Sequence, residues 1–183
     1  NGAVIDTFTG GGLRVVNDVA DGDVIRFEAE VVTGTAYDAW RDAEIGAGSP
    51  PKSGLYEDFD GDGIPNVMEF ALKLDPKGED AAALKPRAAV VETSPGTRQL
   101  EFTFRQRTGG AGAAGVSYAA AGVIYTVQTS VDLNAGSWTE DGSGFTVVGT
   151  PIDNGDGTET ITVRLNGPVN GKRFVRLKVT PVS

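Results

Sequence analysis

A stretch of twelve residues, from Asp58 to Glu69, carries the strongest chemical signal in the chain. Its oxygen donors recur at alternate positions and its sixth residue is a glycine. The predicted metal ligands are Asp58, Asp60, Asp62, Ile64 through its carbonyl, Asn66 and Glu69. Asp at positions one, three and five, Gly at six and Glu at twelve match the calcium loop of an EF-hand. The stretch therefore predicts a Ca²⁺ site.

Each position of this loop has a physical task. The three aspartates wrap one face of a hard cation, Gly63 permits the sharp turn, and the Ile64 carbonyl supplies a neutral oxygen. Asn66 stands where such loops bind the ion directly or through water, and Glu69 closes the shell with both carboxylate oxygens. Mg²⁺ fits this cage worse, because it retains its waters. The alternative interpretation is an acidic surface turn that precedes a helix.

Two short helices and a linker position this loop. Residues 36–45 predict a helix with Thr35 as its N-cap and its apolar residues on the buried side. A linker over 46–54 contains two adjacent prolines, which end the first helix. Residues 65–74 predict a second helix, with Pro65 in its first turn. The buried positions are predicted to be Tyr37, Trp40, Ile45, Val67, Phe70, Ala71 and Leu74. With one loop and an interrupted first helix, we expect a structural site rather than a calcium sensor.

The rest of the chain reads as β-structure. Apolar and polar residues alternate in 98–107 and 159–165, which indicates half-buried strands, and 153–157 predicts a hairpin turn. The predicted strands span 88–93, 98–107, 116 or 123 to 129, 136–139, 145–149, 159–165 and 173–180. Short strands between turn signals favour a mainly β fold, an antiparallel immunoglobulin-like β-sandwich.

The first 34 residues form a strand-like region of their own. The apolar run Ala3–Phe8 is followed by three glycines, at 10–12. Such a strand could complete the sheet of a neighbouring copy and give head-to-tail assembly. An ordinary edge strand or the remnant of a preceding domain are the alternatives. The predicted organisation is thus a strand region at 1–34, the helical calcium segment at 35–86 and the sandwich at 87–183.

The run from Asp58 to Pro76, DFDGDGIPNVMEFALKLDP, resembles a known calcium-binding stretch. It is similar to the thrombospondin type 3-like or dockerin-like stretches near the C-termini of large secreted or surface proteins of bacteria such as Verrucomicrobia and Planctomycetes. The similarity covers 57–183, through YTVQTS at 125–130, Trp138 and RFVRL at 173–177. The resemblance implies a secreted calcium-binding module. Because the duplicated repeat of dockerins is missing, it does not imply cellulosome docking.

Composition excludes several classes of chemistry. The chain has 183 residues and neither Cys nor His, so it forms no disulfide, thiolate nucleophile, Cys/His zinc site or Ser-His-Asp triad. A net charge of -9 disfavours nucleic acid and anionic membrane surfaces as partners. No apolar run is long enough for a membrane span. The absent initiator Met suggests a processed product or an excised piece.

Weaker signals leave two alternatives open. Tyr118, Tyr125 and Trp138 could form a sugar-stacking platform, although aromatic residues of a β domain more often belong to the core. An enzyme that uses carboxylates alone is the second alternative. Gly110–Gly115 satisfies G-x-G-x-x-G, but a strand rather than a helix is predicted after it, which favours a mobile hairpin loop over a dinucleotide site.

The sequence as a whole predicts a non-enzymatic, extracellular or cell-surface module that Ca²⁺ stabilises. Its role is predicted to be structural or adhesive, with other surface proteins or further copies of itself as partners. Strand exchange through Ala3–Phe8 would make it a fibre subunit. The alternative function is a carbohydrate-binding module of a secreted hydrolase, with a glycan as ligand.

Overall fold

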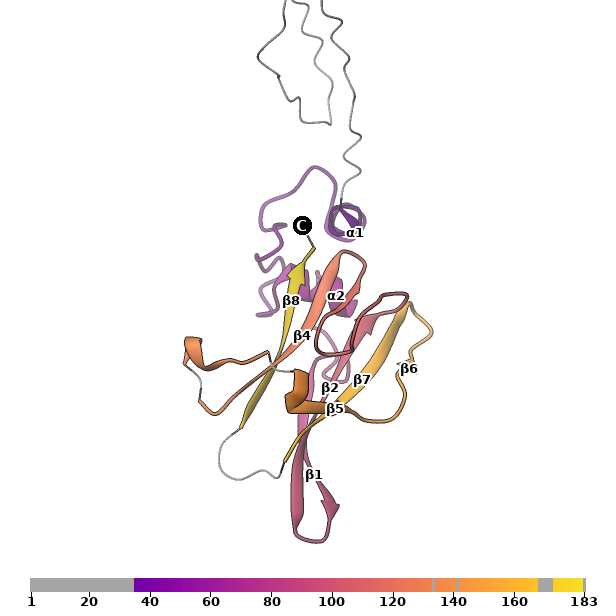
Figure 1. Cartoon of the computed structure of the whole chain (residues 1–183). Helices are drawn as coiled ribbons and strands as arrows, with labels where there is room; N and C mark the ends of the chain where they lie inside the picture. The colour runs from indigo at the N-terminus through magenta and orange to yellow at the C-terminus, as the bar shows by residue number, and fades with distance from the viewer. Residues whose placement is uncertain (1–34, 133, 141, 168–172, 183) are drawn as a thin grey trace, which may run out of the picture. The chain divides into compact units, whose positions relative to one another are not determined.

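Two antiparallel sheets dominate the computed structural model, which describes residues 35–132, 134–140, 142–167 and 173–182 (Figure 1). The first sheet has the order β1-β2-β7-β5, with β6 also paired to β7. The second has the order β3-β4-β8. Their bounds are β1 Arg87–Ser94, β2 Thr97–Arg107, β3 Tyr118–Ala120, β4 Val123–Ser130, β5 Phe145–Val147, β6 Ile152–Asp153, β7 Thr158–Leu165 and β8 Phe174–Pro181. The prediction of a mainly β fold is confirmed, and the two sheets are consistent with a sandwich.

The alternation in the sequence accounts for the first hydrophobic cluster. Phe102 and Phe104 of β2 lie opposite Val163 and Ile161 of β7 in the antiparallel register. All four side chains are buried, and they pack with Val127 of β4, which belongs to the other sheet. Period-two strands with one apolar face thus bury that face against a second sheet, as the sequence predicts.

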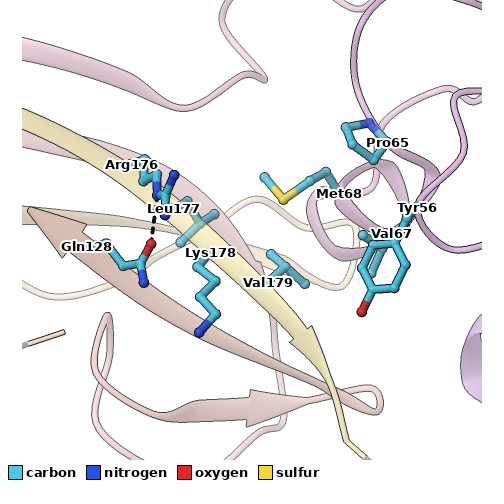
Figure 2. Close-up of a pocket in the computed structure, with 9 residues that line it drawn as sticks. All are labelled: Tyr56, Pro65, Val67, Met68, Gln128, Arg176, Leu177, Lys178 and Val179. Atoms are coloured by element: carbon cyan, nitrogen blue, oxygen red, sulfur yellow. Dashed lines mark hydrogen bonds between the residues drawn. The ribbon is translucent and has the colours of Figure 1, made fainter. Parts of the chain in front are cut away.

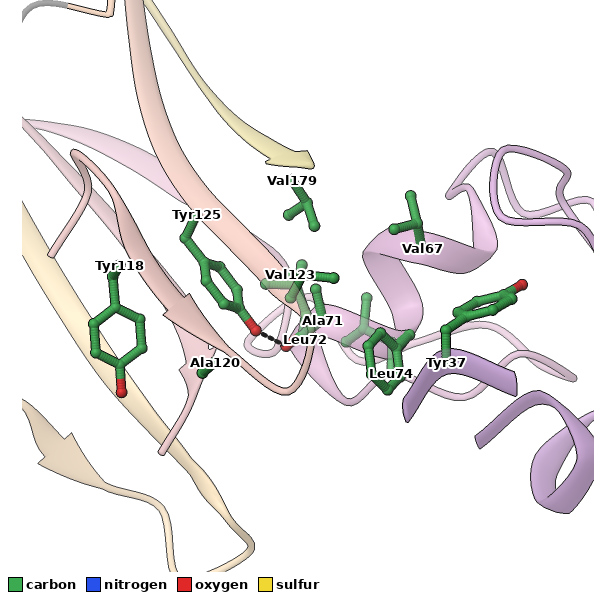
Figure 3. Close-up of a cluster of buried hydrophobic side chains, with 11 residues drawn as sticks. Tyr37, Val67, Ala71, Leu72, Leu74, Tyr118, Ala120, Val123, Tyr125 and Val179 are labelled. Carbon is green, nitrogen blue, oxygen red and sulfur yellow. Dashed lines mark hydrogen bonds between the residues drawn. The ribbon is translucent and has the colours of Figure 1, made fainter. Parts of the chain in front are cut away.

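A second cluster joins the helices to the sheet β3-β4-β8 (Figure 3). It contains Tyr37 of α1 (Ala36–Glu44), Val67 and Leu72 of α2 (Asn66–Leu72), and Val123 and Tyr125 of β4. The Tyr125 hydroxyl donates a hydrogen bond of 2.8 Å to the carbonyl of Ala71. The helical segment and the strands that follow it therefore share one core.

The helix predictions are correct in place and partly wrong in extent. Thr35 caps α1 in a capping box with Asp38, as predicted for the N-cap. The second helix is shorter than 65–74, because Pro65 is its N-cap rather than a first-turn residue and Lys73 turns left-handed at φ 58°. Leu74 is buried as predicted, but it lies beyond the end of the helix.

Two strand predictions need correction. Residues 136–139 do not form a strand: Ala135–Ser137 is a 3₁₀ turn (η1), and Thr139 makes an isolated bridge to Thr129. The strand predicted at 145–149 is β5, which ends at Val147. A second 3₁₀ turn (η2), at Gly142–Gly144, precedes it. Short Gly/Ser-rich runs favour such turns over strands. The hairpin turn at 153–157 is confirmed, since Asp153 pairs with Glu159 across it.

The glycine-rich loop before β3 is closely packed. A side chain at Gly110 would begin 2.3 Å from the carbonyl oxygen of Ala119, and one at Gly112 would begin 2.4 Å from that of Ser117. The glycines are therefore explained by the close approach of two backbone segments, which Ala111 and Ala119 join by a bridge. The strand β3 follows this loop, as predicted.

The predictions for residues 1–34, including the strand Ala3–Phe8, lie outside the described residues. Among those that the structure describes, no helix has the length and apolar character needed to cross a membrane.

Candidate metal centre

The three predicted aspartate ligands converge in the structure. Asp58, Asp60 and Asp62 each place a carboxylate oxygen within 4.8 Å of the other two. Like charges at this separation repel one another, and a cation between them removes the repulsion. The alternate spacing of the three aspartates is thus accompanied by a close approach of their carboxylates.

Backbone N–H groups hold the three carboxylates in place. Every aspartate of the loop accepts at least one N–H from a residue that follows it, a pattern that fixes the curvature of the loop. The bonds run from Gly61 to Asp58 Oδ1 at 2.7 Å, from Gly63 to Asp58 Oδ2 at 2.9 Å, from Asp62 to Asp60 Oδ1 at 3.0 Å and from Ile64 to Asp62 Oδ1 at 2.8 Å. Gly61 and Gly63 have φ values of 84° and 91°, which favour glycine. The loop conformation is therefore built into its own sequence.

Glu69 is the decisive residue of the site. Its side chain is 0% exposed, and neither carboxylate oxygen has a hydrogen-bond donor among the described residues. The Oδ2 atom of Asp60 is likewise buried without a donor. Burial, together with the charges of Asp60 and Asp62, raises the pKa of Glu69 to about 8. A buried carboxylate among other carboxylates needs a proton or a metal ion to compensate its charge.

Asn66 has a task in the structure that the sequence did not predict. It is 0% exposed, and its amide donates to the carbonyls of Lys52 and Gly54, both at 2.8 Å. Its Oδ1 accepts the N–H of Phe59 at 3.1 Å. Asn66 thereby ties the Pro-rich linker to the start of α2. Its role as a ligand stays a prediction, as does that of the Ile64 carbonyl.

The helix that carries Glu69 is bonded to both sheets. The carbonyl of Phe70 accepts two hydrogen bonds from the Arg107 guanidinium of β2, at 3.0 and 2.6 Å, and this guanidinium lies 5.1 Å from the centre of the Phe70 ring. The carbonyl of the next residue, Ala71, accepts the Tyr125 hydroxyl of β4. A ligand at Glu69 therefore acts on an element that spans the interior of the fold.

Sequence reasoning missed two charged residues next to the loop. Asp80 is only 8% exposed, and its Oδ2 has no donor in the described part of the chain. The ammonium of Lys85 lies 3.2 Å from Asp62 Oδ2. Both follow α2 in the sequence, outside the twelve-residue pattern, so no spacing rule could have found them.

No protein-family model matches this chain, and no curated protein matches it in sequence. The resemblance to secreted calcium-binding modules therefore depends on the residues quoted for it.

A shallow groove lies beside the metal loop (Figure 2). One wall is formed by Pro65, Val67 and Met68, and the other by residues 176–179 of β8. Tyr56, whose side chain is 71% exposed, stands at its margin. The groove follows β8, an edge strand of the sheet β3-β4-β8.

The aromatic residues do not form the sugar-stacking platform considered from the sequence. Tyr118 and Tyr125 are buried, at 8% and 0% exposure, and both hydroxyls are used in hydrogen bonds to backbone groups. The guanidinium of Arg176 lies 4.0 Å from the centre of the Trp138 ring and covers one of its faces. The two tyrosines are core residues, which is the more common role of aromatic residues in a β domain.

Proposed function

We propose that this protein is a non-enzymatic structural module whose fold is stabilised by one bound Ca²⁺. The observation that carries the proposal is the Glu69 carboxylate, which is fully buried beside three converging aspartates and lacks a hydrogen-bond donor among the described residues. An all-oxygen set with several carboxylates suits a hard cation that tolerates flexible geometry, and this favours Ca²⁺ over Mg²⁺. The proposed ligands are Asp58, Asp60, Asp62, Ile64, Asn66 and Glu69.

The bound ion would act on stability through α2. It would compensate the buried charge of Glu69 and fix the helix whose carbonyls bind Arg107 and Tyr125. A ligand at a hundred times its dissociation constant adds roughly 2.7 kcal/mol to the free energy of unfolding. That is a large share of the total for a single domain.

The proposed setting is extracellular or at the cell surface. Modules in this setting bind Ca²⁺ with weak affinity. Support for it comes from the resemblance of 57–183 to secreted bacterial modules. An immunoglobulin-like arrangement of the two sheets is part of the same proposal. The adhesive role and the surface partners follow from this setting and have no support from the site itself.

Thermal unfolding tests the calcium proposal directly. The intact chain is melted in millimolar Ca²⁺ and in chelator, next to Asp60→Ala and the control Glu79→Ala, which removes an exposed acid near the site. We expect chelator to lower the Tm of the intact chain and of the control by several degrees, and to leave Asp60→Ala unchanged. Equal Tm values of the intact chain in both conditions would reject the proposal.

The open edge of β8 favours self-assembly as a second candidate function. An edge strand beside an apolar groove is the geometry on which strand addition depends. The proposed donor is Ala3–Phe8 of another copy. Electron microscopy of the intact chain and of a variant without residues 1–9 tests this, because filaments that depend on the donor must vanish with it. Absence of filaments in the intact chain at high concentration would reject it.

The carbohydrate-binding alternative loses its structural basis, because two of its three aromatic residues are buried. A glycan screen of the intact chain, with Trp138→Ala as the comparison, remains the test for it.

A further inference from the structure

A buried carboxylate from outside the loop interacts electrostatically with Asp62 of the metal centre. Asp80 lies in the segment that follows α2, and 8% of its surface is exposed. Its Oδ1 accepts the backbone N–H of Asp75 at 2.9 Å, which fixes the orientation of the carboxylate. Its Oδ2 is buried and has no donor among the residues that the structure describes. An acceptor in this state is costly unless a donor or a cation meets it.

Asp80 and Glu69 are close enough to interact electrostatically. Burial raises the pKa of Asp80, and the charge of Asp62 raises it further. For Glu69, after burial, the charge of Asp80 raises the pKa more than that of Asp58 does, although Asp58 is a predicted ligand. Two buried carboxylates with three unpaired oxygens therefore lie next to the aspartates of the loop.

We propose that Asp80, through Oδ2, is a further ligand of the cation in this centre. The inference rests on the proposed calcium site and extends its shell beyond the EF-hand pattern. With Asp80 included, the ion joins the loop at 58–69 to the segment at 75–85, so that it binds chain on both sides of α2. With Glu69 bidentate, the seven proposed residues supply eight oxygens, which is within the six to eight that Ca²⁺ takes.

Calcium titration calorimetry on the full chain tests the assignment. Asp80→Asn is compared with Glu79→Gln, because both variants remove one carboxylate charge from adjacent positions and only the first removes a proposed ligand. The amide that replaces the carboxylate in Asp80→Asn retains an oxygen for the N–H of Asp75. We expect the Ca²⁺ affinity to fall at least tenfold in Asp80→Asn and less than twofold in Glu79→Gln.

Luminescence lifetimes of Eu³⁺ in H₂O and D₂O separate ligation from a general effect of charge. If Asp80 binds the ion, Asp80→Asn admits one more water molecule to the inner shell, whereas Glu79→Gln leaves the hydration number unchanged. A loss of affinity without this extra water would overturn the inference, because it would show that Asp80 acts through its charge alone. Equal affinities of the two variants would overturn it as well.

The two proposals fail in different ways. An intact chain that binds no Ca²⁺ refutes the calcium site and the assignment together, whereas an intact chain that binds normally and an unaffected Asp80→Asn variant refute the assignment alone. Thermal unfolding in chelator monitors the fold of the variant. There Asp80→Asn should melt no lower than the intact chain, since it removes a buried charge that has no partner in the absence of the ion.

Discussion

Two carboxylates of this protein, Glu69 beside the metal loop and Asp156 in the turn before β7, show opposite responses to their surroundings. Burial raises the pKa of Glu69 to about 8. The hydroxyl of Thr158, followed by the guanidinium of Arg105, lowers the pKa of Asp156 to about 2. The two acids differ in the partners that the fold gives them.

The carboxylate of Asp156 finds its hydrogen-bond donors and a basic partner within the chain. Its oxygens accept the Thr158 hydroxyl at 2.6 Å, the Thr158 N–H at 3.0 Å and the Arg105 guanidinium at 2.5 Å. The described surroundings of Glu69 offer no donor at all. A fold that satisfies one acid within its own chain leaves the more deeply buried one to a proton or to the proposed cation.

The largest expected effect is on the pH dependence of the metal-free protein. The pKa of Glu69 is raised from its ordinary value of 4.5 to about 8 in the folded state, so protonation favours folding. In chelator, the free energy of unfolding should be greatest below about pH 4.5 and should fall as pH rises towards 8. The change is on the order of 5 kcal/mol. Denaturant unfolding at a series of pH values measures it.

Calcium should remove most of this pH dependence, because the ion takes the place of the proton. In Glu69→Gln, the contribution of Glu69 to the fall between pH 4.5 and 8 should be absent even in chelator, and only the fall due to the raised pKa of Asp80 should remain. A fall of the same size in that variant would assign the titration to another group and break the contrast between the two acids.

The next effect is a calcium-dependent change in the relative stability of Glu69→Gln at pH 8. In chelator, the variant should be more stable than the intact chain, because it buries no unpaired charge. In Ca²⁺ at a hundred times the dissociation constant of the intact chain, this advantage should shrink by roughly 2.7 kcal/mol, because only the intact chain gains the free energy of binding. Unfolding curves in the two conditions measure both differences. A variant that is destabilised equally in each would show that Glu69 serves packing alone.

Asp156→Asn should have a smaller and constant effect. The side chain is 37% exposed, so solvent screens its pairing with Arg105, and we expect a loss of about 1 kcal/mol. A lowered pKa stabilises the fold above the ordinary value of 3.8, and this contribution is lost as pH falls towards 2. Urea unfolding should give the same loss with Ca²⁺ and with chelator. A loss that depends on Ca²⁺ would show that the turn is coupled to the metal loop.

The sequence is informative wherever one local rule determines the structure. The alternation in 98–107 predicts which side chains of β2 are buried, and Thr35 predicts the start of α1. The spacing of Asp58, Asp60 and Asp62 predicts that their carboxylates lie close together, as they do. Each of these features depends on neighbours within a few residues, so periodicity and capping preferences are sufficient to find it.

The parts that could not be predicted depend on distant segments. Arg105 breaks the alternation of β2 and is buried because it meets Asp156, which is 51 residues away. Asn66 fits a ligand position by spacing, yet the linker at 52–54 takes its amide. Asp80 is buried in the segment after α2, outside the twelve-residue pattern. No pattern within a window of twelve residues contains these contacts.

The smallest effect concerns Lys85, whose ammonium forms an ion pair with a carboxylate of the loop. Its ammonium lies 3.2 Å from Asp62 Oδ2, at a partly exposed position, so a cation at the centre competes with it for that oxygen. In chelator, Lys85→Gln should lower the free energy of unfolding by about 0.5 kcal/mol, as expected for an exposed pair. The Ca²⁺ affinity should rise about twofold, since the ion no longer competes with an ammonium group. Calorimetry and unfolding in chelator measure the two changes, and Lys77→Gln is the control, because this exposed lysine has no ion pair within the described residues. A lower affinity in Lys85→Gln would mean that Lys85 orients Asp62 for the ion. The metal loop, like the turn at Asp156, would then depend on a basic partner from its own chain.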